Sequence, residues 1–124
     1  MHKFEKLEVW QLAVDYVDIC YAIGDRLPPQ ERYNLTDQLR RAAVSAALNI
    51  AEGSTGQSDL EQARFLGMAI RSVVETVACQ HLIRRRAYLQ DTEPLHHAYV
   101  ASEKLVAKLQ AFRNHLHRRE KRPK

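Results

Sequence analysis

Apolar residues recur every three or four positions along four stretches of the chain, with polar residues between them. This period places the apolar side chains on one face of an α-helix. The stretches run from about Leu7 to Gly24, from Asn34 to Gly53, from Ser58 to Leu89 and from Pro94 to Leu116. No stretch alternates apolar and polar residues long enough to predict a strand. The pattern therefore predicts an all-α fold.

Local sequence signals mark where these helices begin and end. The Leu27–Pro29 segment ends the first helix, because a residue before proline resists the helical conformation. Asn34 is expected to cap the second helix, and Gly53 fits the position just after its end. Ser58 and Glu61 have the spacing of a capping box at the start of the third helix.

The connections between these helices are short, which favours an up-down-up-down four-helix bundle. Residues 26–34 and 89–92 would then lie at one end, and the 53–58 loop and both termini at the other. We expect residues 1–117 to form the bundle and residues 118–124 a basic C-terminal tail.

The composition suits one globular domain. The chain has 124 residues, of which 45% are hydrophobic and 27% charged. It contains no apolar run long enough for a bilayer span and no secretory segment at its start, so we expect a cytoplasmic protein without a membrane partner. Cys20 and Cys79 lack metal-ligand spacing and are expected to be buried thiols.

Positive charge is concentrated in two places. The chain has a net charge of +4, yet residues 113–124 alone carry +5, and a second group of arginines ends the third helix. The candidate phosphate-binding residues are Arg84, Arg85, Arg86, Arg113, Arg118, Arg119, Lys121, Arg122 and Lys124. Such binding would depend on counterion release and would not read base sequence. The plainer interpretation is that these cations complement a helix dipole or form a solvated terminus.

Two segments of the second helix, Gln38–Ser45 (QLRRAAVS) and Asn49–Gly53 (NIAEG), carry a family resemblance. They resemble the signature of a bacterial four-helix-bundle family first noted as proteins encoded in intervening sequences of large-subunit ribosomal RNA genes. The similarity extends over about residues 4–90. The chain departs from the family at Asn34, where glycine is usual, and at Ala46, where isoleucine is usual.

The resemblance implies a cytoplasmic bundle that assembles into ring-like homo-oligomers, with pentamers expected. A more distant relative is the accessory variability determinant of diversity-generating retroelements, a basic pentameric bundle that works with a reverse transcriptase and RNA. The intervening-sequence branch itself has no settled biochemical activity.

A polar stripe runs along the second helix and faces polar residues of the third. Its members are Gln38, Arg41, Ser45, Asn49 and Glu52 on the second helix and Arg64, Ser72 and Glu75 on the third. One interpretation is a ligand or nucleic-acid groove. The other, which we favour, is a structural network within or between subunits. An antiparallel hairpin would bring Arg41 near Ser72 or Glu75, with Glu75 as its partner in a buried pair, and would bring Asn49 and Glu52 near Arg64.

Catalytic and metal-binding patterns are weak. His115 and His117 point about 200° apart on a helix, and His96 and His97 about 100° apart, so neither pair shares an ion easily. The sequence contains neither a phosphate-binding glycine loop nor a nucleophile elbow. We therefore expect no enzyme activity, metal or cofactor.

The sequence as a whole favours a non-enzymatic, homo-oligomeric scaffold that binds RNA, DNA or a ribonucleoprotein without sequence preference. A role as an accessory protein of a reverse transcriptase follows from the distant resemblance. The alternative is a purely protein-binding structural module without affinity for nucleic acid.

Overall fold

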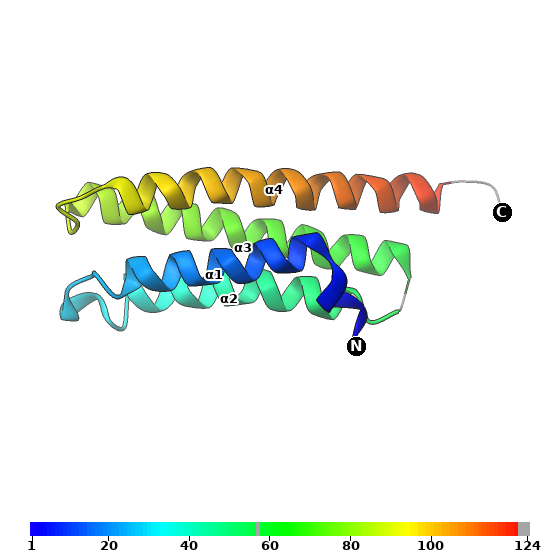
Figure 1. The fold of residues 1–124 in the computed structure, drawn as a ribbon, viewed down its shortest axis with the longest axis horizontal. Helices are drawn as coiled ribbons and strands as arrows, with labels where there is room; N and C mark the ends of the chain where they lie inside the picture. The colour runs from blue at the N-terminus through cyan, green and yellow to red at the C-terminus, as the bar shows by residue number, and fades with distance from the viewer. Residues whose placement is uncertain (57, 122–124) are drawn as a thin grey trace.

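A computed structural model describes residues 1–56 and 58–121, and it confirms the predicted all-α four-helix bundle (Figure 1). The helices are α1 (Glu8–Gly24), α2 (Leu35–Gly53), α3 (Asp59–Arg86) and α4 (Glu93–Glu120). Two short 3₁₀ helices precede α1 and α2, namely η1 (Lys3–Lys6) and η2 (Pro29–Glu31). The α4 helix continues to Glu120, so the first three residues of the expected tail are helical.

Most predicted helix starts and ends are close to the observed ones. The Ser58 hydroxyl accepts a hydrogen bond from the Glu61 amide at 3.1 Å, as the capping box predicts. Asn34 occupies the cap position of α2 but makes no capping bond with its side chain. Glu31 replaces it by accepting from the Leu35 amide at 3.4 Å. The α3 helix ends at Arg86 rather than Leu89, because Ala87 takes a left-handed conformation with φ of 58°.

Gly53 serves a different purpose from the one expected. It is the last residue of α2, and a Cβ atom there would lie 2.7 Å from Cβ of Phe65 on α3. Its missing side chain therefore allows close approach of α2 and α3. The left-handed turn falls on Gly56, whose φ is +92°.

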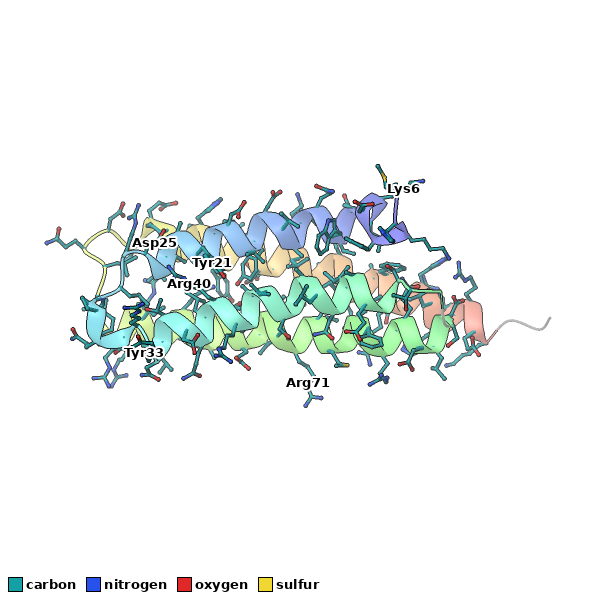
Figure 2. The ribbon with its side chains drawn as sticks, turned by 90° about the horizontal axis from the view of Figure 1, so that it is seen from below. Lys6, Tyr21, Asp25, Tyr33, Arg40 and Arg71 are labelled. Atoms are coloured by element: carbon teal, nitrogen blue, oxygen red, sulfur yellow. The ribbon has the colours of Figure 1, made fainter. Side chains whose placement is uncertain are left out.

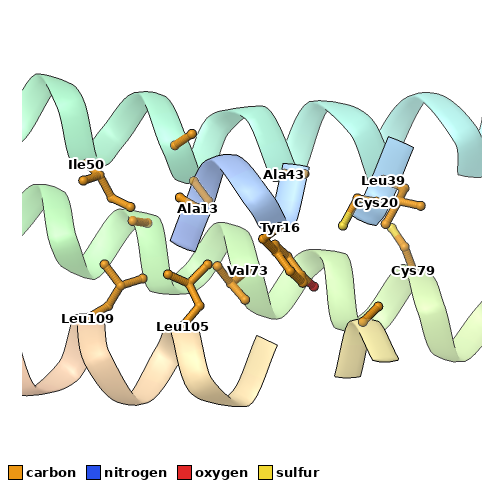
Figure 3. Packing of buried hydrophobic residues seen from close by; sticks show 14 of the residues in the cluster. Ala13, Tyr16, Cys20, Leu39, Ala43, Ile50, Val73, Cys79, Leu105 and Leu109 are labelled. Carbon is orange, nitrogen blue, oxygen red and sulfur yellow. The ribbon is translucent and has the colours of Figure 1, made fainter. Parts of the chain in front are cut away.

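The core is continuous along the bundle. Helix α1 packs against α2 and α4, and α3 packs against the same two helices from the opposite corner. Leu39, Ile50, Val73, Leu105 and Leu109 are fully buried between them (Figure 3). Each such side chain contributes roughly 1.5–3 kcal/mol when it leaves water. None of the described helices is long and apolar enough to cross a membrane.

The two ends of the bundle differ in what they contain (Figure 1). The loop pole holds residues 25–34 and 87–92, and the termini pole holds the N-terminal turn, the end of α4 and the connection between α2 and α3. Helices α1 and α3 both run from the termini pole to the loop pole. The predicted placement of the connections, the N-terminus and the end of the fourth helix is confirmed.

Candidate functional site

The loop pole carries the arginine triplet at the end of α3. Arg84, Arg85 and Arg86 are exposed, and none of them forms an ion pair within residues 1–56 and 58–121. Helix α3 stops directly after them, so the three side chains spread around the last helical turn. Arg26 and Arg32 are exposed at the same pole. Five exposed arginines therefore lie at the loop pole.

Glu31 and Tyr88 hold the loop pole in place. The Tyr88 hydroxyl donates to Glu31 at 2.6 Å, and the Asn34 amide donates to the same carboxylate at 3.0 Å. The Tyr88 hydrogen bond is the main reason that the pKa of Glu31 lies below its usual range, and the bonds from Leu35 and Asn34 add to it. This contact joins the α1–α2 connection to the α3–α4 connection beside the arginine triplet.

A hollow of about 200 Å³ lies between α3 and α4 next to this pole. Arg84, His81, His96 and Tyr99 line it together with the buried Gln80. The rings of His81 and Tyr99 meet edge to face with their centres 6.4 Å apart. Aromatic rings therefore lie beside one arginine of the triplet, which the sequence pattern did not predict.

The termini pole contains the remaining candidate basic residues, and they are not equivalent. Arg118 and Lys121 are exposed, whereas Arg119 forms two hydrogen bonds to Asp59 at 2.6 and 2.5 Å. This bond pair lowers the pKa of Asp59 and raises that of Arg119. Arg113 is half-buried against Gly67, and its Nε atom has no partner in the described chain. Arg122 and Lys124 lie outside the described residues.

Sequence reasoning missed two basic residues at this pole. Lys3 and Lys6 line a hollow of about 630 Å³ together with His115 and Arg119. The η1 turn packs against α1 and the end of α2, and the hollow beside it brings these lysines close to the end of α4. The sequence predicted that both termini lie at one end of the bundle, and this was the signal that could have pointed to the two lysines. The 3₁₀ turn that carries them has no repeating apolar pattern from which it could be predicted.

The polar stripe on α2 and α3 is divided in the structure. Ser45 and Ser72 meet across the two helices at 3.1 Å, and the Asn49 amide donates to the Ser45 carbonyl at 2.9 Å. The Gln38 amide donates to Asn34 at 3.1 Å, along α2 itself. Arg64 pairs with Glu61 one turn away at 2.6 Å. The charge of Glu52 also raises the pKa of Arg64, but its effect is smaller than that of Glu61.

The expected pair of Arg41 and Glu75 does not form within the subunit. Arg41 pairs instead with Asp37 on its own helix at 3.0 Å, and its side chain is 80% exposed. A partner four residues away needs no precise placement of another helix, which favours the local pair. Arg41, Ser45, Asn49 and Glu52 border an open hollow of about 710 Å³ that also contains Leu48 and Met68.

A second polar group lies inside the core and was not predicted. The Tyr16 hydroxyl contacts the Thr76 hydroxyl at 2.6 Å and accepts from the Gln80 amide at 2.9 Å (Figure 3 shows Tyr16). Burial raises the pKa of Tyr16 well above its usual range and raises the pKa of Cys20 to about 12. Cys20 and Cys79 are both buried free thiols, as predicted. These groups are enclosed and serve the packing of α1 on α3.

The histidines, cysteines and acidic residues are dispersed over the bundle. In residues 1–56 and 58–121, no three of these side chains are close enough to hold a metal ion. The surface features that remain are the two basic poles and the exposed face of α2 and α3.

Comparison with known proteins identifies one family. A family model described as 23S rRNA-intervening sequence protein matches residues 5–111, which covers most of the chain and all of α1, α2 and α3. A search of curated proteins finds no match to this chain.

Proposed function

The chain belongs to the family of 23S rRNA-intervening sequence proteins, and from this premise we propose that it is a non-enzymatic, homo-oligomeric scaffold for nucleic acid or a ribonucleoprotein. It acts in the cytoplasm and needs no cofactor. Its distant resemblance to the retroelement accessory proteins extends the proposal to a pentameric ring and to a reverse transcriptase as a protein partner. The basic residues supply the contacts to phosphate.

The observation that carries this proposal is the exposed triplet Arg84, Arg85 and Arg86. Capping a helix dipole needs one cation in the last turn, and here three arginines remain without a carboxylate partner in the described chain. In a symmetric ring the triplet is repeated in every subunit. Repetition raises the density of positive charge toward a polyanion far above that of one subunit.

Salt dependence of binding tests the proposal directly. We expect the wild-type protein to bind an RNA duplex, an RNA single strand and a DNA duplex at low salt, with affinity falling steeply as salt rises. The variant Arg84→Gln/Arg85→Gln/Arg86→Gln should lower the slope of log K against log salt by about 0.7–0.9 for each phosphate that is no longer neutralised. Fluorescence anisotropy over a salt series measures both quantities.

A matched control separates this site from general loss of charge. Arg41→Gln/Arg64→Gln removes two arginines that already pair with carboxylates on their own helices, so it should change the slope little. Deletion of residues 118–124 tests the termini pole, with circular dichroism as a check because it also removes the Arg119 contact to Asp59. Equal slopes for the triplet variant and the control would contradict the role of Arg84–Arg86.

The second candidate function is a protein-binding module without nucleic-acid affinity. The exposed side chains of Leu60, Val74 and Leu82 on α3 favour it, because aliphatic residues grouped on one helix are typical of protein contacts. If the protein bound none of the three nucleic acids at low salt, the protein-binding module would be favoured over the nucleic-acid scaffold.

A further inference from the structure

The hollow between α3 and α4 beside the loop pole, which we call the α3–α4 hollow, has a volume of about 200 Å³. Sites that enclose a whole drug-sized ligand are larger, roughly 300–1,000 Å³. At about 30 Å³ for each water molecule, the α3–α4 hollow corresponds to roughly six waters. It therefore has room for one flat heterocycle of the size of a nucleobase, but not for a whole nucleotide.

Aromatic rings from both helices line the α3–α4 hollow. His81 on α3 and Tyr99 on α4 have ring centres 6.4 Å apart and planes at 82°, and His96 adds a third ring. Tyr99 is 43% exposed, so part of its ring is open to a ligand. A planar group stacked on one of two perpendicular rings meets the edge of the other, and aromatic groups favour both contacts.

The wall of the α3–α4 hollow includes a buried hydrogen-bond acceptor without a partner. The Thr76 hydroxyl donates to the Val73 carbonyl, so its oxygen accepts from Tyr16. The Tyr16 oxygen in turn accepts from the side-chain NH₂ group of Gln80. This direction leaves Oε1 of Gln80 unpaired within the described chain, on a side chain that is only 5% exposed. An N–H group that reached this oxygen from the hollow would complete its bonding, and every nucleobase carries such a group on its Watson–Crick edge.

Arg84 supplies positive charge at the α3–α4 hollow. Its side chain is exposed and forms no ion pair with any other residue that the structure describes. Among the described residues, those that line the hollow include no carboxylate. A guanidinium can bind a phosphate through two N–H groups at once. The hollow thus combines rings on which a base can stack with a cation for the phosphate of the same nucleotide.

The carboxylates around the α3–α4 hollow leave the Arg84 side positive. Glu75 lies two residues before Val77, so it is about 200° away around α3. Glu103 lies one turn beyond Tyr99, toward the termini pole. Asp91 and Glu93 at the start of α4 are on the Arg84 side, where the three arginines of the triplet outnumber them. The carboxylates near the lining residues in sequence are Glu75, Asp91, Glu93 and Glu103.

We propose that the α3–α4 hollow binds one unstacked nucleobase of a single-stranded nucleic acid, with the phosphate of that nucleotide at Arg84. The proposal rests on the nucleic-acid scaffold of the proposed function and names the kind of strand that the loop pole prefers. Stacking tolerates all bases because each has a π face, which agrees with binding without sequence preference. In a duplex the bases are stacked on one another, so a duplex reaches only the arginines.

Removal of one ring tests the α3–α4 hollow. We expect Tyr99→Leu to weaken binding of a short RNA single strand by about five- to a hundredfold, which corresponds to the loss of one stacked base. The loss should be the same at every salt concentration, because stacking on a ring releases no counterions. The slope of log K against log salt should therefore stay as in the wild type, and so should the affinity for an RNA duplex. Fluorescence anisotropy over a salt series measures these quantities.

Tyr21→Leu is the matched control. Tyr21 on α1 is 42% exposed and also lies beside an arginine, with the Arg40 guanidinium 4.9 Å from its ring centre (Figure 2). It does not line the α3–α4 hollow, so its loss should leave the affinity for the single strand unchanged. Circular dichroism and sedimentation velocity should show both variants folded and assembled like the wild type.

Two further arms change the ligand in place of the protein. The same RNA strand with its bases removed keeps all its phosphates, and the wild type should lose about as much affinity for it as Tyr99→Leu loses for the intact strand. Adenosine monophosphate, titrated by calorimetry, carries a base and a phosphate without a strand. It should bind far more weakly than the strand, because the other arginines of the triplet then have no phosphate to contact.

Four results would overturn the inference. Equal single-strand affinities of Tyr99→Leu and Tyr21→Leu would exclude the α3–α4 hollow and leave binding through the arginines in place. Loss of assembly together with affinity in Tyr99→Leu would assign Tyr99 to a contact between subunits. Adenosine monophosphate that binds as tightly as the strand would assign the hollow to a free nucleotide. A wild-type protein that binds no nucleic acid at low salt would remove the proposed function, and this inference with it.

Discussion

At the scale of single residues, Tyr16 organises the polar centre of the core. Its ring is fully buried, and its hydroxyl joins Thr76 and Gln80 on the diagonally opposite helix. The side-chain oxygen Oε1 of Gln80 has no hydrogen-bond partner in the described chain. The hydrogen bond from the Gln80 side-chain NH₂ group to the Tyr16 hydroxyl is therefore the contact that holds this side chain. A hydrogen bond across the bundle fixes the height of α1 relative to α3, which apolar contacts alone specify less sharply.

We predict that Tyr16→Phe lowers the free energy of unfolding by about 1–3 kcal/mol, because it leaves the buried Gln80 amide without a partner. Urea denaturation followed by circular dichroism measures this change. Tyr33→Phe is the matched control, since Tyr33 is 83% exposed and its hydroxyl can bond to water. Equal stability of the two variants would show that the Tyr16 hydroxyl contributes nothing.

At the scale of helices, α2 and α3 make the most extensive contact in the bundle. Alanines on α2, among them Ala43, Ala46 and Ala47, are buried where larger side chains would keep the helices apart. Gly53 extends this close contact to the termini pole, where it lies against Phe65. Ala46 is one of these buried positions and is 1% exposed.

Two glycines within helices should respond to alanine with opposite signs. In Gly53→Ala the new Cβ would lie 2.7 Å from Cβ of Phe65, so the helices must separate and stability should fall by about 1–3 kcal/mol. In Gly67→Ala the nearest atom is the flexible Arg113 guanidinium at 3.4 Å, and the gain in helix propensity should raise stability by about 0.5–1 kcal/mol. Thermal melting of both variants measures the difference. A stabilised Gly53→Ala protein would contradict the close approach.

At the scale of the whole molecule, each pole is held by one contact between distant parts of the chain. Glu31 and Tyr88 join the two connections at the loop pole, and Asp59 and Arg119 join the start of α3 to the end of α4. Both contacts hold basic regions in place. The first lies beside the arginine triplet, and the second pairs Arg119 with a carboxylate.

The Glu31–Tyr88 contact predicts a specific acid dependence. Because the pKa of Glu31 is lower in the folded protein than its ordinary value of 4.5, this group stabilises the fold above about pH 4.5. The contribution is lost as the pH falls through the folded-state pKa. Tyr88→Phe removes the main cause of the lowered pKa, so its stability should be lower at neutral pH and should decline less on acidification. Urea denaturation between about pH 6 and 3 tests this, and parallel curves for both proteins would contradict it.

Several features could be predicted from the sequence because they depend on local signals. The three- and four-residue apolar period marked the four helices, and Leu27–Pro29, Ser58 and Pro94 marked where they end or begin. Short connections then allowed only antiparallel neighbours. The same reasoning placed the termini at one end and the arginine triplet at the other, and the signature segments of α2 indicated the family.

The side-chain partners depended on how the helices pack. Period and spacing show which residues share a face, but they do not set the rotation and offset of one helix against another. Arg41 was expected beside Glu75 and instead pairs with Asp37, and Tyr16 finds Thr76 sixty residues away. Lys6 joins the basic pole through a turn without a repeating pattern. These contacts arise only when the core packs, because the fit of buried side chains fixes the rotation and offset of each helix.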